Sequence, residues 1–312
     1  MNLKVSFVIP CYRSEKTLSL VVDEIITTVK DKADFEIVLV NDSSPDNTFG
    51  VISELCKKYN NIIGVNFAQN FGQHAALMAG MRQTSGDIVI CLDDDGQTPA
   101  NEAFKLIDKL EEGYDVVYAK YSNKKHSVFR NFGSKVNSLM TESMLAKPKK
   151  LFISSYFAAR RFVVDEILKY ENPYPYVIGL ILRTTKNIAN VEVNHRQREI
   201  GKSGYTLKKL ISLWVNGFTA FSVKPLRLAT IGGVVVAIIG FLSFICTIIN
   251  KIINPDVPLG WSSTMAVLLI LGGLILLVLG MIGEYIGRIY ICINNSPQYV
   301  IREIVKNEKS ED

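Results

Sequence analysis

The first half of the chain alternates short apolar runs with segments whose apolar residues recur at helical spacing. The apolar runs are 5–9, 35–40, 62–67, 87–92 and 115–119, and the helical patterns are 15–29, 45–58, 73–84 and 99–111. Such alternation is typical of an α/β domain with a largely parallel sheet. Ligands bind such sheets at the carboxyl ends of the strands. In this chain polar residues follow three strands, at 10–15, 41–44 and 93–97.

The last third has a different pattern. Two runs of about 23 residues, 228–250 and 261–283, carry no charged side chain. At about 1.5 Å per residue, a helix of either run is long enough to cross a hydrocarbon core of about 30 Å. A pair of buried core helices is the alternative. Because uncharged runs above about 18 residues favour spans, we expect a transmembrane helical hairpin over 228–283 that turns at 251–260.

The segment 206–227, just before the hairpin, has an amphipathic pattern. Its apolar side recurs at helical spacing and comprises Leu207, Leu210, Ile211, Trp214, Phe218 and Phe221, while Lys208 and Lys209 lie on the other side. An ordinary core helix is one interpretation. The position beside a span favours the other, a juxtamembrane helix in the bilayer interface.

Charge indicates the orientation of the hairpin. The net charge of +5 is too small to indicate a nucleic-acid partner. Basic residues flank the two apolar runs: Lys202, Lys208, Lys209, Lys224 and Arg227 before, and Arg288, Arg302, Lys306 and Lys309 after. Because positive flanks remain cytoplasmic, we expect a multi-pass protein of the cytoplasmic membrane. Its N-terminal domain (1–205) and its tail (284–312) would both be cytoplasmic.

Two further features agree with a cytoplasmic domain. The apolar run near the N-terminus is too short for a signal peptide. The five cysteines show no paired spacing, which fits a reducing compartment without disulfides and argues against a zinc site.

Three consecutive aspartates, Asp93, Asp94 and Asp95, follow the fourth apolar run. Like charges this close raise the pKa of at least one carboxyl unless a cation lies among them. Mg²⁺ and Mn²⁺ prefer oxygen ligands, and alternate residues of an extended segment point the same way. We therefore expect Mg²⁺ or Mn²⁺ to be held by Asp93, Asp95 and Gln97. A solvated acidic turn is the alternative.

Two further loops carry candidate binding residues. Asp42 ends the second apolar run and could reach a nucleotide base or ribose, or form an Asx turn before Pro45. Gln73 and His74 begin a predicted helix, whose N-terminus favours anions, although His74 could equally be an ordinary first-turn residue. G-x-G-x-x-G does not follow the first strand and G-x-x-x-x-G-K-[ST] does not occur. This disfavours a dinucleotide oxidoreductase or a P-loop ATPase.

Five segments carry a resemblance that covers nearly the whole chain. They are VSFVIPCY (5–12), EIVLVNDSS (36–44), NFGQHAALMAG (70–80), LDDDGQ (92–97) and HRQREIGKSGY (195–205). With the hairpin that follows them, they resemble the family 2 glycosyltransferases of GT-A fold. Within this family the chain is similar to the polyprenyl-phosphate glycosyltransferases, which include dolichol-phosphate mannose synthase and bacterial undecaprenyl-phosphate glucose and formamido-arabinose transferases.

The resemblance implies a metal-dependent transferase that moves a sugar from a nucleotide-diphosphate sugar to polyprenyl (undecaprenyl) phosphate, with inversion, for cell-surface glycan modification. The positions matching the family's nucleotide-sugar site are Pro10, Tyr12, Glu15, Asp42, Gln73 and Asp93. Those matching its phosphate or acceptor contacts are Arg130, Arg198, Lys202, Ser203 and Tyr205. Asp95 and Arg198 would be the catalytic residues, and Asp93, Asp95 and Gln97 the metal ligands. Each basic residue could instead form a surface salt bridge, and a homo-oligomer is left open.

The chain departs from the family pattern at two places. Gly204 stands where many members have lysine, and the segment 152–156 lacks an aspartate that many members carry. A membrane scaffold that keeps a degenerate nucleotide fold is therefore an alternative. A processive polysaccharide synthase is disfavoured because Gln-x-x-Arg-Trp is absent, and a nucleotidyltransferase would not need the hairpin.

Overall fold

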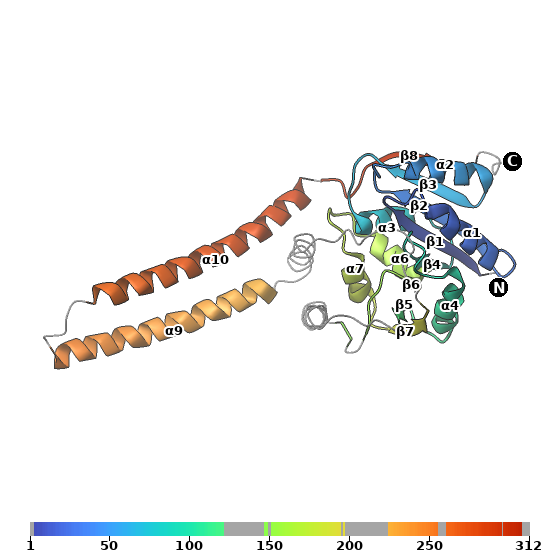
Figure 1. Cartoon of the computed structure of the whole chain (residues 1–312). Helices are drawn as coiled ribbons and strands as arrows, with labels where there is room; N and C mark the ends of the chain where they lie inside the picture. Colours follow the sequence, from blue (N-terminus) through green and yellow to red (C-terminus); the bar gives the residue numbers. More distant parts are fainter. Residues whose placement is uncertain are drawn as a thin grey trace. The chain divides into compact units, whose positions relative to one another are not determined.

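The computed structural model describes residues 3–121, 147–148, 151–194, 196, 224–254, 260–294 and 296–307. The chain divides into two compact units, Met1–Tyr205 with Asn295–Asp312, and Thr206–Asn294 (Figure 1). The second unit is thus inserted into the chain of the first. Several predicted features lie outside the described residues: Arg130, Arg198, Lys202, Ser203, Tyr205 and the segment 206–223.

The elements predicted in the first half are confirmed, with ends that differ by a few residues. They are β1 (Lys4–Cys11), α1 (Leu18–Val29), β2 (Asp34–Asn41), α2 (Thr48–Lys58), β3 (Ile62–Phe67), α3 (Gln73–Arg82), β4 (Ile88–Cys91), the short 3-10 helix η1 (Ala100–Glu102), α4 (Ala103–Glu111) and β5 (Val116–Tyr121). The structure adds β6 (Phe157–Arg160), α6 (Arg161–Leu168), α7 (Val177–Thr184), β7 (Ile188–Val193) and β8 (Ile301–Val305).

The strands form one mixed sheet in the order β7-β5-β6-β4-β1-β2-β3-β8. The pairs β1–β2, β2–β3, β1–β4 and β5–β7 are parallel, whereas β6 and β8 pair antiparallel to their neighbours. The sheet is therefore mostly parallel, as predicted. The chain runs outward from β1 to β3 and then returns through α3 to β4, on the other side of β1. Strand order reverses between β1 and β4, and such a switch point is where open α/β sheets bind ligands.

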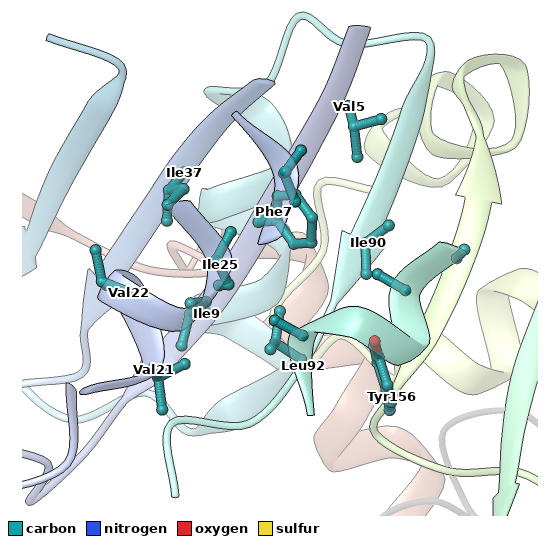
Figure 2. Packing of buried hydrophobic residues seen from close by; sticks show 14 of the residues in the cluster. Val5, Phe7, Ile9, Val21, Val22, Ile25, Ile37, Ile90, Leu92 and Tyr156 are labelled. Atoms are coloured by element: carbon teal, nitrogen blue, oxygen red, sulfur yellow. The ribbon is translucent and has the colours of Figure 1, made fainter. Parts of the chain in front are cut away.

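Helices cover both faces of the central strands. On one face, Phe7 and Ile9 of β1 belong to the same buried cluster as Val21, Val22 and Ile25 of α1 (Figure 2). Because both faces are covered, the central strands consist of nearly continuous apolar residues rather than alternating ones.

On the other face, α3 packs closely against β1 and β2. Its small residues Ala75, Ala76 and Ala79 are buried against Val38 and Val40 of β2. A Cβ added to Gly80 would lie 2.4 Å from Cγ1 of Val8, so a larger residue there would push the helix away from the sheet. This close packing determines where α3 begins, at the carboxyl ends of the strands.

Within the predicted tail at 284–312, the described residues include regular structure. Residues up to Ile293 continue a long helix, and Ile301–Val305 form the edge strand β8 beside β3. The ring of Tyr299 stacks on Phe67 with centroids 5.3 Å apart. The Asn66 amide donates to Glu303 at 2.9 Å. The segment after the hairpin is therefore part of the first unit.

The second unit contains two long helices, α9 (Lys224–Ile253) and α10 (Trp261–Ile293). Because α9 begins at Lys224, residues 224–227 belong to it and not to the predicted interfacial helix. Of the described residues, Ile270–Ile293 has a mean hydropathy of 2.0 and is long and apolar enough to cross a membrane, while Ala229–Leu242 is a shorter apolar helix. One candidate span is therefore found, and the second span of the hairpin stays a prediction.

Replacing Tyr299 by alanine should lower the free energy of unfolding by about 1–2 kcal/mol, because it removes the stack on Phe67 and weakens the attachment of β8. Thermal melting of the full chain in detergent would measure this. The matched control is Ile304→Ala in β8 itself, where the side chain is 42% exposed. It should change stability by about 0.5 kcal/mol or less. Equal effects of the two substitutions would contradict a stabilising role for the stack.

Candidate active site

The loops that follow β1 and β4 are joined across the switch point by Asp94. Its carboxylate accepts hydrogen bonds from the backbone N–H of Tyr12 at 3.0 Å and from the Ser14 hydroxyl. Burial raises the pKa of Asp94, and these hydrogen bonds oppose the rise. Asp94 was not among the predicted site residues. Its contacts show that the middle aspartate of the triplet points back into the protein and holds the loop after β1.

Asp93 connects the same loop to two other segments. One carboxylate oxygen accepts from the Gln73 amide at 3.0 Å and the other from the Ser155 hydroxyl. Burial is the main cause that raises the pKa of Asp93 to about 6. The charges of Asp95 and Asp94 raise it further, while the hydrogen bonds of Ser155 and Gln73 lower it. Ser155 lies in the segment where the family aspartate is missing.

Asp95 and Gln97 form the turn that continues this acidic loop, defined here as residues 93–97. The Gln97 backbone N–H donates to Asp95 Oδ1 at 3.1 Å. Gly96 has φ of 70°, a left-handed conformation that glycine adopts without strain. Burial raises the pKa of Tyr121, and the charges of Asp93 and Asp95 both raise it further. The two predicted carboxylate ligands therefore both affect the pKa of one hydroxyl group, that of Tyr121.

The predicted ligands Asp93, Asp95 and Gln97 fit a divalent cation only together with a bound molecule that supplies further oxygen ligands. Among the residues that the structure describes, no group of three or more His, Cys, Asp or Glu side chains could hold a metal. Mg²⁺, however, is commonly bound by one or two carboxylates with water and substrate phosphates. Burial first, and the neighbouring charges of Asp95 and Asp94 second, disfavour the ionised form of Asp93 by more than its neutral hydrogen-bond donors favour it. A cation shared with a diphosphate would favour the ionised form.

Asp42 is buried beside the loop that leads into α3. Its two carboxylate oxygens accept from the backbone N–H groups of Phe71 at 2.7 Å and Gly72 at 2.9 Å, and its carbonyl accepts from the Asn70 amide at 3.0 Å. Burial raises the pKa of Asp42 and the two backbone donors lower it. Asp42 thus holds the loop that leads into α3, and its contact with a nucleotide stays a prediction.

The other residues predicted to line the nucleotide site lie around the loops after β1 and β2. Pro10 is buried in β1, Tyr12 is 46% exposed, and Glu15 accepts from the Asn47 backbone N–H at 3.2 Å. Arg13 and Ser43 have φ of 61° and 52°, unusual values for residues with a side chain. Such strained positions occur preferentially at ligand sites.

His74 is not suited to bind phosphate as a cation. Its ring contacts Tyr176 edge-on at 5.1 Å between centroids, and Nδ1 is buried without a hydrogen-bond partner among the described residues. Burial lowers the pKa of His74 to about 4. The imidazole is therefore neutral near pH 7, which favours the interpretation of His74 as an ordinary helix residue.

Arg196 is the one described residue of the basic segment, defined here as residues 195–205. Its backbone N–H donates to the Gln97 carbonyl at 3.0 Å. Its guanidinium donates to both carboxylate oxygens of Glu24, at 2.7 and 3.1 Å. The structure thus brings the start of the basic segment to the acidic loop. Neither Glu24 nor Ser155 carries a local sequence signal that would have identified it.

Comparison with known proteins agrees with this geometry. The sequence model of glycosyl transferase family 2 matches residues 6–168, and that of the GtrB C-terminal hairpin matches residues 224–289. The chain is 32% identical to the undecaprenyl-phosphate 4-deoxy-4-formamido-L-arabinose transferase of Photorhabdus laumondii, over 99% of this chain and 96% of the relative. It is 34% identical to the enzyme of the same name from Proteus mirabilis, over 98% and 95% of the two chains.

The first unit also resembles solved structures. Glucosyl-3-phosphoglycerate synthase from Mycobacterium tuberculosis, in complex with Mn²⁺ and uridine-diphosphate-glucose, matches with a TM-score of 0.52 and 21% identity, over 68% of this chain and 75% of that one. This likeness confirms the predicted α/β fold of GT-A type.

The substitution Asp93→Asn should stabilise the metal-free protein at pH 7.5 by about 1–2 kcal/mol, because it removes a charge that burial disfavours. The raised pKa of about 6 means that this penalty is complete above pH 6 and disappears as the pH falls toward the unfolded value of 3.8. The gain should therefore be less than half as large at pH 4.5. Thermal melting in detergent with EDTA would measure it, with the exposed Asp31→Asn as the control. A destabilised Asp93→Asn protein at pH 7.5 would contradict the conclusion that burial disfavours the charge of Asp93.

Proposed function

The chain belongs to glycosyl transferase family 2, and on this basis we propose that it transfers a sugar from a nucleotide-diphosphate sugar to the phosphate of undecaprenyl phosphate. The observation that carries this proposal is the acidic loop at the switch point, hydrogen-bonded to the loop after β1 and to the first residue of α3. A nucleotide diphosphate is the ligand class whose charge complements such a loop in the presence of a divalent metal. The near full-length similarity to undecaprenyl-phosphate transferases supports the acceptor.

A divalent metal held by Asp93 and Asp95, with Gln97 beside them, would neutralise the departing diphosphate. The protein's own groups prepare this site. The Ser155 hydroxyl and the Gln73 amide donate to Asp93 and favour its ionised form, while Asp94 fixes the loop after β1. Arg198 and Lys202 are proposed to stabilise phosphate charge from the basic segment.

The reaction forms a bond between a phosphate oxygen of the lipid and the anomeric carbon of the sugar. The bond from that carbon to the diphosphate breaks, and the diphosphate leaves with the electron pair. The second pKa of a phosphate monoester lies near about 6, so the attacking group is largely dianionic at pH 7 and needs no strong general base. The absence of an aspartate at 152–156 is compatible with this chemistry. We propose inversion at the anomeric carbon.

The hairpin is proposed to hold the enzyme in the cytoplasmic membrane with both α9 and α10 spanning it. Support comes from the match to a C-terminal hairpin family, from the apolar segment Ile270–Ile293 and from the uncharged run 228–250. Since the hairpin unit is inserted in the chain of the first unit, both of its ends connect to the same domain. An even number of spans is required by that connection, and basic flanks favour the cytoplasmic side.

The proposed function predicts sugar transfer to lipid in isolated membranes. Membranes that contain the protein would be incubated with radiolabelled UDP-, GDP- and dTDP-sugars, undecaprenyl phosphate and Mn²⁺ or Mg²⁺. Label should appear in the extracted lipid with one of the donors, and EDTA should abolish it. A scaffold with a degenerate site would show neither lipid labelling nor metal-dependent binding of any nucleotide sugar.

Replacing Asp95 by asparagine keeps the size of the side chain and an acceptor for the Gln97 backbone N–H, but removes the charge. We expect turnover to fall by at least about 100-fold, the order found when one charge-stabilising group is lost. The melting-temperature increase caused by Mn²⁺ with nucleotide diphosphate should also disappear. Asp31→Asn, an exposed aspartate far along the chain from the acidic loop, is the control. Near-normal turnover of Asp95→Asn would exclude the metal role of Asp95.

A further inference from the structure

Glu24, in the middle of α1, accepts three hydrogen bonds although it lies outside the predicted site. Its Oε1 accepts from the Ala100 backbone N–H at 3.1 Å and from Nη2 of Arg196 at 3.1 Å, and its Oε2 accepts from Nη1 of Arg196 at 2.7 Å. The side chains of Glu24 and Arg196 are 29% and 51% exposed. A two-point guanidinium–carboxylate contact holds both partners in one orientation, which a single contact would not do.

The donors lie within or close to the two segments that carry the proposed chemistry. Ala100 begins η1, three residues after the acidic loop, and Arg196 is the second residue of the basic segment. Two other contacts join the same parts of the chain. The Arg196 backbone N–H donates to the Gln97 carbonyl at 3.0 Å, and the amide of Asn194, just before the basic segment, donates to Glu102 of η1 at 2.8 Å. Glu24 supplies the charged contact in this set.

The carboxylate of Glu24 also pairs the charge of Arg196. Both terminal nitrogens of Arg196 donate to Glu24, so this charge is neutralised on α1. Arg198, two residues later, is the arginine proposed to meet phosphate. Without Glu24, residue 196 would lose its charged attachment to α1.

We infer that Glu24 is a positioning residue for the sugar transfer, acting by holding Arg196 beside the acidic loop; this inference rests on the proposed function. An exposed ion pair alone contributes little to stability. The inference therefore predicts a defect in turnover without a matching defect in stability.

The test compares Glu24→Gln, Arg196→Gln and the double variant, as full-length protein in detergent with donor, undecaprenyl phosphate and Mn²⁺. The Glu24→Gln side chain keeps one oxygen for Ala100 but cannot accept from both guanidinium nitrogens. We expect each single variant to lower kcat about tenfold, to keep the donor KM within about twofold, and to melt within a few degrees of the wild type. Because the two residues act as one unit, the kcat of the double variant should lie within about twofold of the kcat of either single variant.

Asp23→Asn is the matched control on the same helix. The Asp23 side chain interacts with Lys58 and with the Tyr59 hydroxyl, at 3.8 and 3.0 Å, and its contacts within the described part of the chain include neither the acidic loop nor Arg196. It should leave kcat unchanged. The inference would be overturned by a normal kcat in Glu24→Gln, or by a double variant in which the losses of the two single variants multiply. It would also be overturned if the loss of kcat came with a clear rise in the donor KM and a clear fall in melting temperature. Failure of the proposed function would be seen differently, as the absence of labelled lipid with the wild-type protein.

Discussion

Negative charge concentrated at the carboxyl end of β4 is the constraint on which the arrangement of the site depends. Three adjacent carboxyl groups follow a buried strand, and burial raises the pKa of Asp93 and of Asp94. Each of these two is held by neutral donors from a different part of the chain: Tyr12 and Ser14 for Asp94, and Gln73 and Ser155 for Asp93. The repulsion that would separate the carboxylates is thus opposed by hydrogen bonds from three other segments of the chain: the loop after β1, the start of α3 and the segment at Ser155.

These contacts require the first residue of α3 to lie close to β4, and the packing of the sheet provides that. Alanines and Gly80 let α3 approach β1 and β2 so closely that a single added carbon at Gly80 would clash with Val8. The position of the Gln73 amide is therefore determined by close packing further along the same helix. Stability and site geometry depend on the same small residues.

The chain on either side of the hairpin is tied into the catalytic unit. Before the hairpin, Arg196 is attached to Glu24 and to the Gln97 carbonyl. After it, Glu303 of β8 accepts from Asn66, whose side-chain oxygen accepts from Asn41 at 2.8 Å. Asn41 in turn accepts from the Ser44 backbone N–H at 3.2 Å, in the loop after β2. A chain of polar contacts therefore connects the C-terminal strand with a loop at the edge of the site.

The sequence by itself determined the features that depend on local periodicity: the strands and helices of the first half, the apolar runs of the hairpin and the acidic loop at a strand end. It did not reveal β8, since nothing local in Ile301–Val305 indicates pairing with a strand more than two hundred residues earlier. Nor did it show that Asp94 points inward, that Asp42 holds the loop before α3, or that Glu24 meets Arg196. Those outcomes depend on which polar groups face each other after the sheet and helices have packed. Only the tertiary structure decides them, because the partners are brought together by the burial of other residues and not by their own spacing.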